Sequence, residues 1–504
     1  MRILDAVTGR VTMYRLVAIV LGAIALTAIA LATAGQLAYG WLQLLVSLAV
    51  LLAATVAAST LAALPFRVRP QLDSALVTAL LLFFLLPPPR FEGVAELGVL
   101  ALAGGVAGAS KFLIAWRGRH LLNPAAAGAV AVTATGLSYS GWWVATPPLF
   151  PIVLVGALVV LLRVRRLPLA VLFVAVATAI ELARYLPTTT PADAAATIFL
   201  SLPTVFLAGF MLSEPLTLPP LRWQRALVGA VVAVLFAVPF HLGPVDGSPQ
   251  LAILAGNVIG FAFGQRRGIR LELLDQRELA PGTREIALRP LRPLRFRPGQ
   301  YLELDLPHRG ADLRGRRRLF SISSAAADGT ITIAMSHREP LSSFKRALFA
   351  LTPGSRLSAT GVAGDFTLPE RGRLLLVAGG IGITPFAAQL GTAQLGAAQL
   401  GTGRHPLTTV VYATSAAGPP YREVLEASGA RVVLFAPTEP ERMPAGWSYA
   451  GPGRLSAERI LAAVPDAGQY RAFVAGPPGF VAELRRQLRR AGVRRVTTDA
   501  FTGY

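Results

Sequence analysis

The feature that most constrains this chain is a series of long apolar segments that fills its first half. Before Arg266 we find ten stretches of about 20 mostly apolar residues with short loops between them, and after Arg266 charged residues become frequent. A helix that crosses a bilayer needs about 20 such residues. The sequence therefore predicts a polytopic α-helical membrane domain followed by a soluble half. The predicted spans are about 12–34, 41–65, 72–88, 94–114, 121–140, 144–162, 167–186, 195–213, 224–242 and 249–265.

Composition supports this division and limits the chemistry. The 504 residues are 53% hydrophobic and 15% charged, whereas soluble domains carry about 25% charged residues. The chain has no cysteine, which excludes disulfides, thiolate nucleophiles and cysteine-ligated iron–sulfur clusters within it. We expect no metal site. The first apolar run is long enough to span, so we interpret it as a helix and not as a cleavable signal.

The distribution of arginine predicts an orientation. The net charge is +21, and Lys111 and Lys345 are the only lysines in the sequence. Arginines alternate with acidic residues from loop to loop along the predicted spans, and basic loops face the cytoplasm. We therefore expect a multi-pass protein of the cytoplasmic (inner) membrane, with the bilayer as a partner and with the N-terminus and the soluble half in the cytoplasm. The charge is spread rather than clustered and lacks interleaved aromatics, so we expect no nucleic-acid partner.

Two polar motifs interrupt the apolar half. Asn123-Pro124-Ala125-Ala126 follows one cytoplasmic loop, and Ser213-Glu214-Pro215-Leu216-Thr217 closes the eighth predicted span. Both motifs could be helix caps at the membrane edge, or non-helical backbone that lines a cavity. They resemble motifs of the D subunit of the Rnf complex and the B subunit of the sodium-pumping NADH:quinone reductase. That resemblance implies electron transfer across the bilayer through a second flavin (FMN), with Asn123, Glu214 and Thr217 as flavin-binding residues.

The seventh predicted span contains one acidic and one basic side chain. Glu181 and Arg184 lie one helical turn apart. Two interpretations stay open: a local ion pair that neutralises both charges, or a role in moving protons or ions.

The soluble half begins with short alternating runs between residues 271 and 335 that predict an antiparallel barrel. Within it, Arg318 offers a planar fork for phosphate, Phe320 can stack on a flat ring, and Ser321 can hydrogen-bond a flavin. Taken alone, such a strand end is usually a solvated edge. Ser342 and Ser343 open a predicted helix whose free N–H groups suit a pyrophosphate. The candidate cofactor-binding residues of the barrel are Arg318, Leu319, Phe320, Ser321, Ser324, Ser342, Ser343, Gly361 and Gly364.

The last 130 residues alternate predicted strands and helices. A buried strand from Leu374 leads into a glycine turn and then a helix, where absent side chains let a dinucleotide approach the backbone and Thr384 is expected to cap the helix. A second strand ends in a glycine–proline turn, and the chain closes on an acidic–aromatic segment. The candidate residues here are Gly379, Gly380, Gly382, Thr384, Pro385, Gly476, Pro477, Asp499, Phe501 and Tyr504.

Taken in this order, these motifs resemble the ferredoxin–NADP reductase superfamily over 270–504. The resemblance implies FAD on the barrel, NAD(P)H on the α/β domain and hydride transfer to the flavin, with Ser321, Asp499 and Phe501 as catalytic residues at the reacting edge. Tyr412 to Ala417 contains no arginine for a 2′-phosphate, which favours NADH. We therefore expect three domains: a membrane domain (1–268), an FAD-binding barrel (269–370) and a parallel α/β domain (371–504).

The leading functional hypothesis is a membrane-bound flavoprotein oxidoreductase. Electrons would pass from cytoplasmic NAD(P)H through FAD into and across the membrane, to a redox partner at the outer face or in the membrane. A first alternative is an NADH:quinone reductase, with or without ion coupling. A second, non-enzymatic alternative is a transporter or channel whose soluble half senses redox state.

Overall fold

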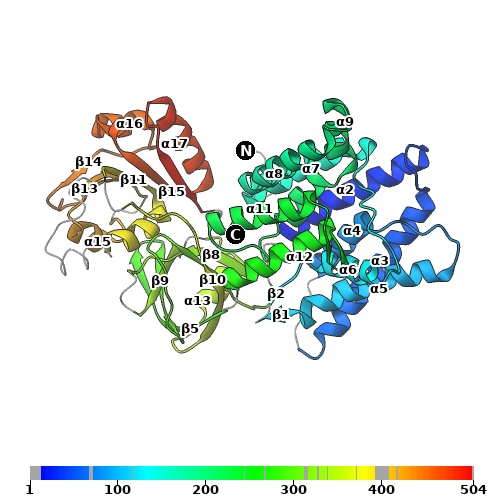
Figure 1. Ribbon diagram of the computed structural model, residues 1–504. Coiled ribbons are helices and arrows are strands. Elements are labelled where there is room, and N and C mark those ends of the chain that lie inside the picture. Colours follow the sequence, from blue (N-terminus) through cyan, green and yellow to red (C-terminus); the bar gives the residue numbers. More distant parts are fainter. Residues whose placement is uncertain are drawn as a thin grey trace. The chain divides into compact units, whose positions relative to one another are not determined.

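The computed structural model divides the chain into two compact units, Asp5–Arg267 and Gly268–Tyr504. The first is helical and the second contains two large sheets (Figure 1). The antiparallel and parallel sheets confirm the fold class expected for the soluble half. The structure describes residues 13–66, 72–116, 119–242, 245–265, 268–310, 316–325, 329–337, 339–369, 372–391, 408–415 and 418–501.

Every predicted span of the first unit contains helix. One of them is broken, and its two halves, Pro191–Ser201 and Thr204–Met211, meet at an angle of 50°. The break follows from Pro203, which cannot supply a backbone donor inside a helix. The helices are α2 (Met13–Thr33), α3 (Trp41–Ala63), α4 (Leu72–Leu85), α5 (Val94–Leu113), α6 (Pro124–Ala134), α7 (Phe150–Val164), α8 (Leu167–Tyr185), α9 (Pro191–Ala196), α10 (Thr204–Phe206), α11 (Arg222–Ala237) and α12 (Pro249–Gly260).

The lengths of these helices support fewer membrane spans than the hydropathy pattern predicts. Within the described residues, five helices are long and apolar enough to cross a membrane, or six if the bent pair is one span. The span expected at 121–140 is helical only over Pro124–Ala134, because Asn123 caps it and Gly136 turns with φ +71°. Several long apolar helices are compatible with a membrane protein, while ten spans stay a prediction.

Glycines let neighbouring helices of this unit approach closely. A Cβ on Gly108 of α5 would lie 2.6 Å from the carbonyl oxygen of Thr55 in α3. A Cβ on Gly128 of α6 would lie 2.4 Å from the carbonyl oxygen of Ala103 in α5. Small residues serve this purpose in membrane helices, where packing rather than hydrophobic burial drives association.

The second unit begins with a six-stranded antiparallel sheet in the order β8-β7-β10-β5-β6-β9. An isolated bridge between Ile322 and Ile333 joins its two end strands and closes the barrel. Alternating side chains such as Leu271, Leu273 and Ile286 fill the barrel core, as the period-two pattern predicts. The strands are β5 (Ile269–Ala280), β6 (Thr283–Pro290), β7 (Tyr301–Asp305), β8 (Arg317–Ser321), β9 (Ile331–Ser336) and β10 (Arg356–Ala363), with helix α13 (Ser343–Phe349) after β9.

The rest of this unit is a parallel sheet in the order β14-β13-β12-β11-β15-β16, covered by helices. All six residues of the central strand β11 are buried, as expected for a strand covered on both faces. The strands are β11 (Leu374–Gly379), β12 (Thr408–Ala413), β13 (Arg431–Phe435), β14 (Trp447–Tyr449), β15 (Arg471–Gly476) and β16 (Val496–Ala500). The helices are α15 (Arg422–Ala427), α16 (Ala457–Ala463) and α17 (Pro478–Arg490), and η5 (Gly380–Ile383) follows β11.

The barrel and the parallel sheet are joined by side chains that cross between them. Phe366 follows the barrel, and its ring lies 5.6 Å from that of Phe386 and 5.7 Å from that of Phe473 in the core of the α/β sheet. The side-chain amide of Gln389 donates to the carbonyl oxygen of Phe366 at 2.6 Å. These contacts hold the two sheets in one unit.

Candidate functional site

The carboxyl edge of the parallel sheet brings together three predicted motifs that are far apart in sequence. Asp499 is paired with Ala475 across β16 and β15, and the backbone N–H of Phe501 donates to the carbonyl oxygen of Gly476 at 2.9 Å. Strand β15 lies beside β11, which ends in Gly379. The carboxyl edge of a parallel sheet is where such folds bind ligands. Tyr504 lies outside the described residues.

The glycines of the turn after β11 have different physical roles. A Cβ on Gly382 would lie 2.2 Å from the carbonyl oxygen of Ala475, and one on Gly379 would lie 2.8 Å from the ring of Phe480. These two glycines are therefore required by packing within the protein. Gly380 is half-buried and has φ +56° with open space around its Cβ position, so its backbone is the part of the turn that a ligand can approach.

Thr384 does not cap the following helix as we expected. It lies in helical conformation, is 1% exposed, and its hydroxyl donates to the carbonyl oxygen of Ile381 at 3.0 Å. The expectation was wrong because η5 already supplies the first turn, so Thr384 satisfies a carbonyl of that turn and not a free N–H group. Pro385 is helical and buried next to it.

The edge strand β8 presents the arginine motif of the barrel. Arg318 is 4% exposed, and its guanidinium carbon lies 5.1 Å from the ring centroid of Phe344 in α13. The ring of Phe320 lies 6.0 Å from the same ring, so both side chains share one face of β8. Leu319 points the other way and is 46% exposed. This cation–π contact and the hydrogen bond from Nη1 of Arg318 to the carbonyl oxygen of Arg317 at 2.8 Å hold the guanidinium in place, so Arg318 is a positioned group and not a solvated edge.

The serines around the barrel edge have partners within the protein. The Ser342 hydroxyl accepts from the backbone N–H of Lys345 at 3.3 Å and so caps α13, and Ser324 accepts from the N–H of Thr332 at 3.1 Å. Nε2 of His308 lies 3.1 Å from the Ser343 hydroxyl. Sequence reasoning missed His308, because nothing in its local pattern indicates a partner 35 residues away.

The end of β10 leaves room for a ligand on the same barrel. Gly361 has open space around its Cβ position, and Gly364 has φ +114° with its Cβ position 3.0 Å from the ring of Tyr301. Tyr301 is paired with Ser321 across β7 and β8, and β7 also pairs with β10, so one strand separates the glycine segment from the arginine motif. With open backbone at Gly361 and Gly380 and a fixed cation at Arg318, the residues present fit a flavin adenine dinucleotide and a nicotinamide dinucleotide.

A buried acid–phenol contact joins the barrel to the α/β sheet. The hydroxyl of Tyr421, which precedes α15, donates to Oε1 of Glu285 in β6 at 2.9 Å, and Arg277 pairs with Oε2 at 2.7 Å. Burial, and then the charge of Glu285, raises the pKa of Tyr421 well above its usual value. The sequence held no sign of this contact, because it joins two positions that are 136 residues apart.

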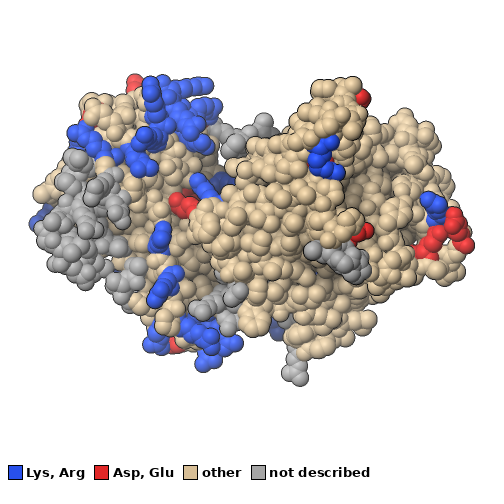
Figure 2. All heavy atoms as spheres, viewed as in Figure 1, with Lys and Arg blue, Asp and Glu red and all other residues tan. Residues whose placement is uncertain are grey.

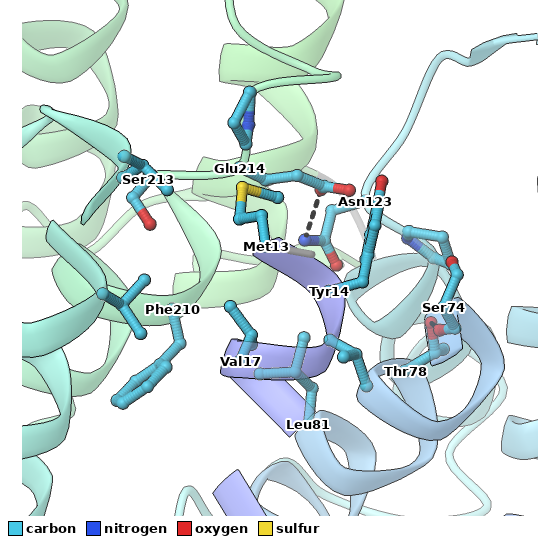
Figure 3. Close-up of a pocket in the computed structure, with 15 residues that line it drawn as sticks. Met13, Tyr14, Val17, Ser74, Thr78, Leu81, Asn123, Phe210, Ser213 and Glu214 are labelled. Carbon is cyan, nitrogen blue, oxygen red and sulfur yellow. Dashed lines mark hydrogen bonds between the residues drawn. The ribbon is translucent and has the colours of Figure 1, made fainter. Parts of the chain in front are cut away.

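The helical unit contains a polar centre built from both of its predicted motifs (Figure 3). The side-chain amide of Asn123 donates to Oε2 of Glu214 at 3.1 Å, and Nε2 of His120 lies 3.0 Å from Oε1. The backbone N–H of Asn123 donates to Oδ1 of Asn257 at 2.7 Å, while its own Oδ1 caps α6. Asn123 therefore acts both as a helix cap and as part of a buried network. Sequence reasoning missed His120 and Asn257 as members.

A cavity of about 40 Å³ adjoins this centre. Figure 3 shows Glu214 and Asn123 at one end and Val17, Leu81 and Phe210 at the other. The space holds a few water molecules and is far smaller than the roughly 300–1,000 Å³ of ligand clefts. Thr217 is 1% exposed beside Glu214. Asn123, Glu214 and Thr217 thus meet, but they bond to each other and leave no room for a flavin ring. At this centre, the described residues form no cavity large enough for a flavin ring, and a second flavin stays a prediction.

The local ion pair in the seventh predicted span is present. Arg184 Nη1 lies 2.8 Å from Oε2 of Glu181, and the same nitrogen donates to the carbonyl oxygen of Ala237 in α11 at 2.7 Å. The pair therefore satisfies its own charges and ties α8 to α11.

The C-terminal half matches FAD- and NAD-binding reductases of the ferredoxin–NADP reductase type. It is 27% identical over 253 residues to the reductase subunit of an aromatic O-demethylase from Amycolatopsis sp., covering 47% of this chain and 70% of that protein. It is 29% identical over 236 residues to the electron transfer component of toluate 1,2-dioxygenase from Pseudomonas putida, covering 46% and 66%. These relatives are NAD(P)H-dependent, FAD-containing oxidoreductases, and by this similarity the chain is an oxidoreductase.

Further comparisons concern the same half. A flavohemoprotein from Pseudomonas putida is 32% identical over 206 residues, which cover 40% of this chain and 49% of that protein. Among solved structures, the Amycolatopsis cytochrome P450 reductase GcoB matches with a TM-score of 0.38 and 26% identity, covering 47% of this chain and 70% of that one. The chain thus spans between half and about 70% of the length of these relatives. No protein-family model matches the chain.

Proposed function

We propose that this protein is a membrane-bound reductase that takes electrons from NADH at its C-terminal unit and delivers them to an acceptor in or across the membrane. The observation that carries the proposal is the convergence, within one compact unit, of a fixed arginine on the barrel and an open glycine turn on the parallel sheet. That unit is continuous in sequence with several helices long and apolar enough to cross a bilayer. FAD, when bound, accepts a hydride from the nicotinamide and releases the electrons singly or in pairs.

The protein's own residues would bind and orient the cofactors. Arg318, held against Phe344, supplies a bidentate donor for the flavin pyrophosphate. The backbone at Gly380, at the start of η5, supplies N–H groups for the nucleotide phosphates. Asp499 and Phe501, at the end of β16, lie beside Gly476 and would border the nicotinamide. Preference for NADH is supported by Thr414 and Ser415, which follow β12 where an arginine would bind a 2′-phosphate.

The purified full chain tests this proposal. We expect one FAD per chain after acid precipitation and oxidation of NADH, in preference to NADPH, with a soluble artificial acceptor. Arg318→Gln should lower flavin retention at least tenfold, since it removes a charge-assisted bidentate contact. Arg289→Gln is the matched control, because Arg289 is 56% exposed and pairs on the surface with Glu272. A chain that binds no flavin, or an Arg318→Gln variant that retains it, would contradict the proposal.

The acceptor is addressed by a second experiment. NADH is supplied to sealed inside-out vesicles that contain an impermeant dye. Dye reduction supports transfer across the membrane, whereas activity only with added quinone supports the quinone reductase. Solute transport into vesicles that needs no NADH, in a chain without flavin, would instead support a transporter with a sensing domain.

A further inference from the structure

The parallel sheet collects arginines on the edge opposite to its nucleotide-binding edge. Because all six strands run the same way, the residues that begin them lie together. The backbone N–H of Arg471 donates to the carbonyl oxygen of Arg373, and that of Ala472 donates to Arg495, each at 2.9 Å. Helix α17 ends at the same edge, because it returns from the carboxyl end of β15 to the start of β16. We name this surface the basic edge; its exposed members are Arg431, Arg471, Arg489, Arg490, Arg494 and Arg495.

The charges of the basic edge are not offset locally. Within the described residues, the structure records no ion pair for any of its six exposed arginines, whereas Asp466 neutralises Arg373 and Glu483 pairs with Arg486. Figure 2 shows Lys and Arg side chains gathered over the surface where Figure 1 draws α17. Our expectation that the charge is spread along the chain was therefore wrong here. Residues separated in sequence become one patch because a parallel sheet aligns its strand starts.

We propose that the basic edge binds the anionic headgroups of the membrane that carries this protein. The proposal rests on the proposed membrane placement of the chain. Arginine is well suited to phosphate groups, because its planar fork donates in pairs. Only residues 266–268 separate η4 (Phe261–Gln265), which ends the last apolar segment, from β5, and three residues span at most about 11 Å. Lipid phosphates are therefore the polyanion at highest local concentration around this unit.

This contact would also orient the reductase unit. The nucleotide-binding motifs lie at the carboxyl ends of β11, β15 and β16, while the basic edge lies at the opposite ends of the same strands. A basic edge seated on headgroups therefore leaves the nucleotide-binding edge open to the solution. Each basic residue near an anionic surface strengthens binding by about fivefold, so loss of four arginines should weaken headgroup contact on the order of several hundredfold.

The absence of cysteine in the full chain permits a direct test. A single Ala491→Cys, at an exposed position after α17, carries a fluorophore, and the protein is reconstituted into bilayers that contain a headgroup-attached quencher. We expect strong quenching with one-third anionic lipid and at least twofold less with neutral lipid. High salt should abolish the difference, because the screening length falls to about 3 Å at 1 M. A variant in which four arginines are replaced by glutamine (Arg489, Arg490, Arg494 and Arg495) should also lose the difference in quenching between anionic and neutral lipid.

The matched control carries the label at Gly418→Cys on the opposite edge, where a Cβ meets no atom within 4 Å; it should stay unquenched. NADH oxidation with a soluble acceptor should be unchanged in the four-arginine variant, which verifies its folding. Equal quenching in neutral and anionic bilayers, or at both label positions, would overturn the proposal. The proposal would also be overturned if the fluorescence of the label did not depend on lipid charge but changed when an oligonucleotide or an acidic protein was added. Failure of the labelled chain to float with bilayers would instead contradict the proposed membrane placement.

Discussion

A methyl group at Gly382 tests whether the turn after β11 is held by close packing against β15. In Gly382→Ala the new Cβ would lie 2.2 Å from the carbonyl oxygen of Ala475 and 2.8 Å from the Cα of Gly476. Favourable carbon contacts lie at about 3.5–4.0 Å, so the backbone must separate by about 1 Å. Overpacking of this kind costs about 1–3 kcal/mol. For a unit of this size that corresponds to a fall in Tm of about 2–12 °C.

The assay is thermal unfolding of the solubilised full chain, together with NADH oxidation. We expect activity to fall about 100-fold, since a 1 Å misplacement costs this much in a positioned site. Gly479→Ala is the control for an added methyl group, because its Cβ meets no atom within 4 Å; it should change neither property. Gly380→Ala also has open space but φ +56°, so it should cost only the conformational strain of about 1–2 kcal/mol. An unchanged Tm and unchanged activity in Gly382→Ala would refute the packing argument.

Three further predictions concern buried polar groups. Tyr421→Phe should lower the unfolding free energy by about 1–2 kcal/mol, because it removes a hydrogen bond to the buried Glu285 carboxylate; faster hydrogen exchange across β6 and α15 would show it, and unchanged exchange would count against it. Because the pKa of Tyr421 is raised in the folded protein, its stabilisation is complete below about pH 10 and is lost as the pH rises through the folded pKa. Tyr421→Phe should therefore reduce the alkaline loss of Tm. Asn257→Ala should cost about 1–3 kcal/mol, because the buried N–H of Asn123 loses its acceptor; equal thermal stability of the variant and the parent would disprove this.

Local patterns were enough to predict the two halves of the chain and the reductase fold. An apolar run of about 20 residues indicates a helix even when the segments packed against it are unknown. In the same way, apolar residues at alternate positions, such as Leu271 and Leu273, indicate a strand with one buried face. The arginine and glycine motifs could be located for the same reason, because each is a short segment between a strand and a turn. Their contacts with cofactors remain predictions.

Tertiary structure decided which distant residues share a site and how much room that site leaves. His120 and Glu214 are 94 residues apart, and Tyr421 and Glu285 are 136 apart, so no local period relates them. Whether Gly382 serves a ligand or the packing of the fold depends on the strand placed against it. The small cavity beside Glu214 and the basic edge of the parallel sheet follow in the same way from chain topology, since topology alone brings separate segments to one surface.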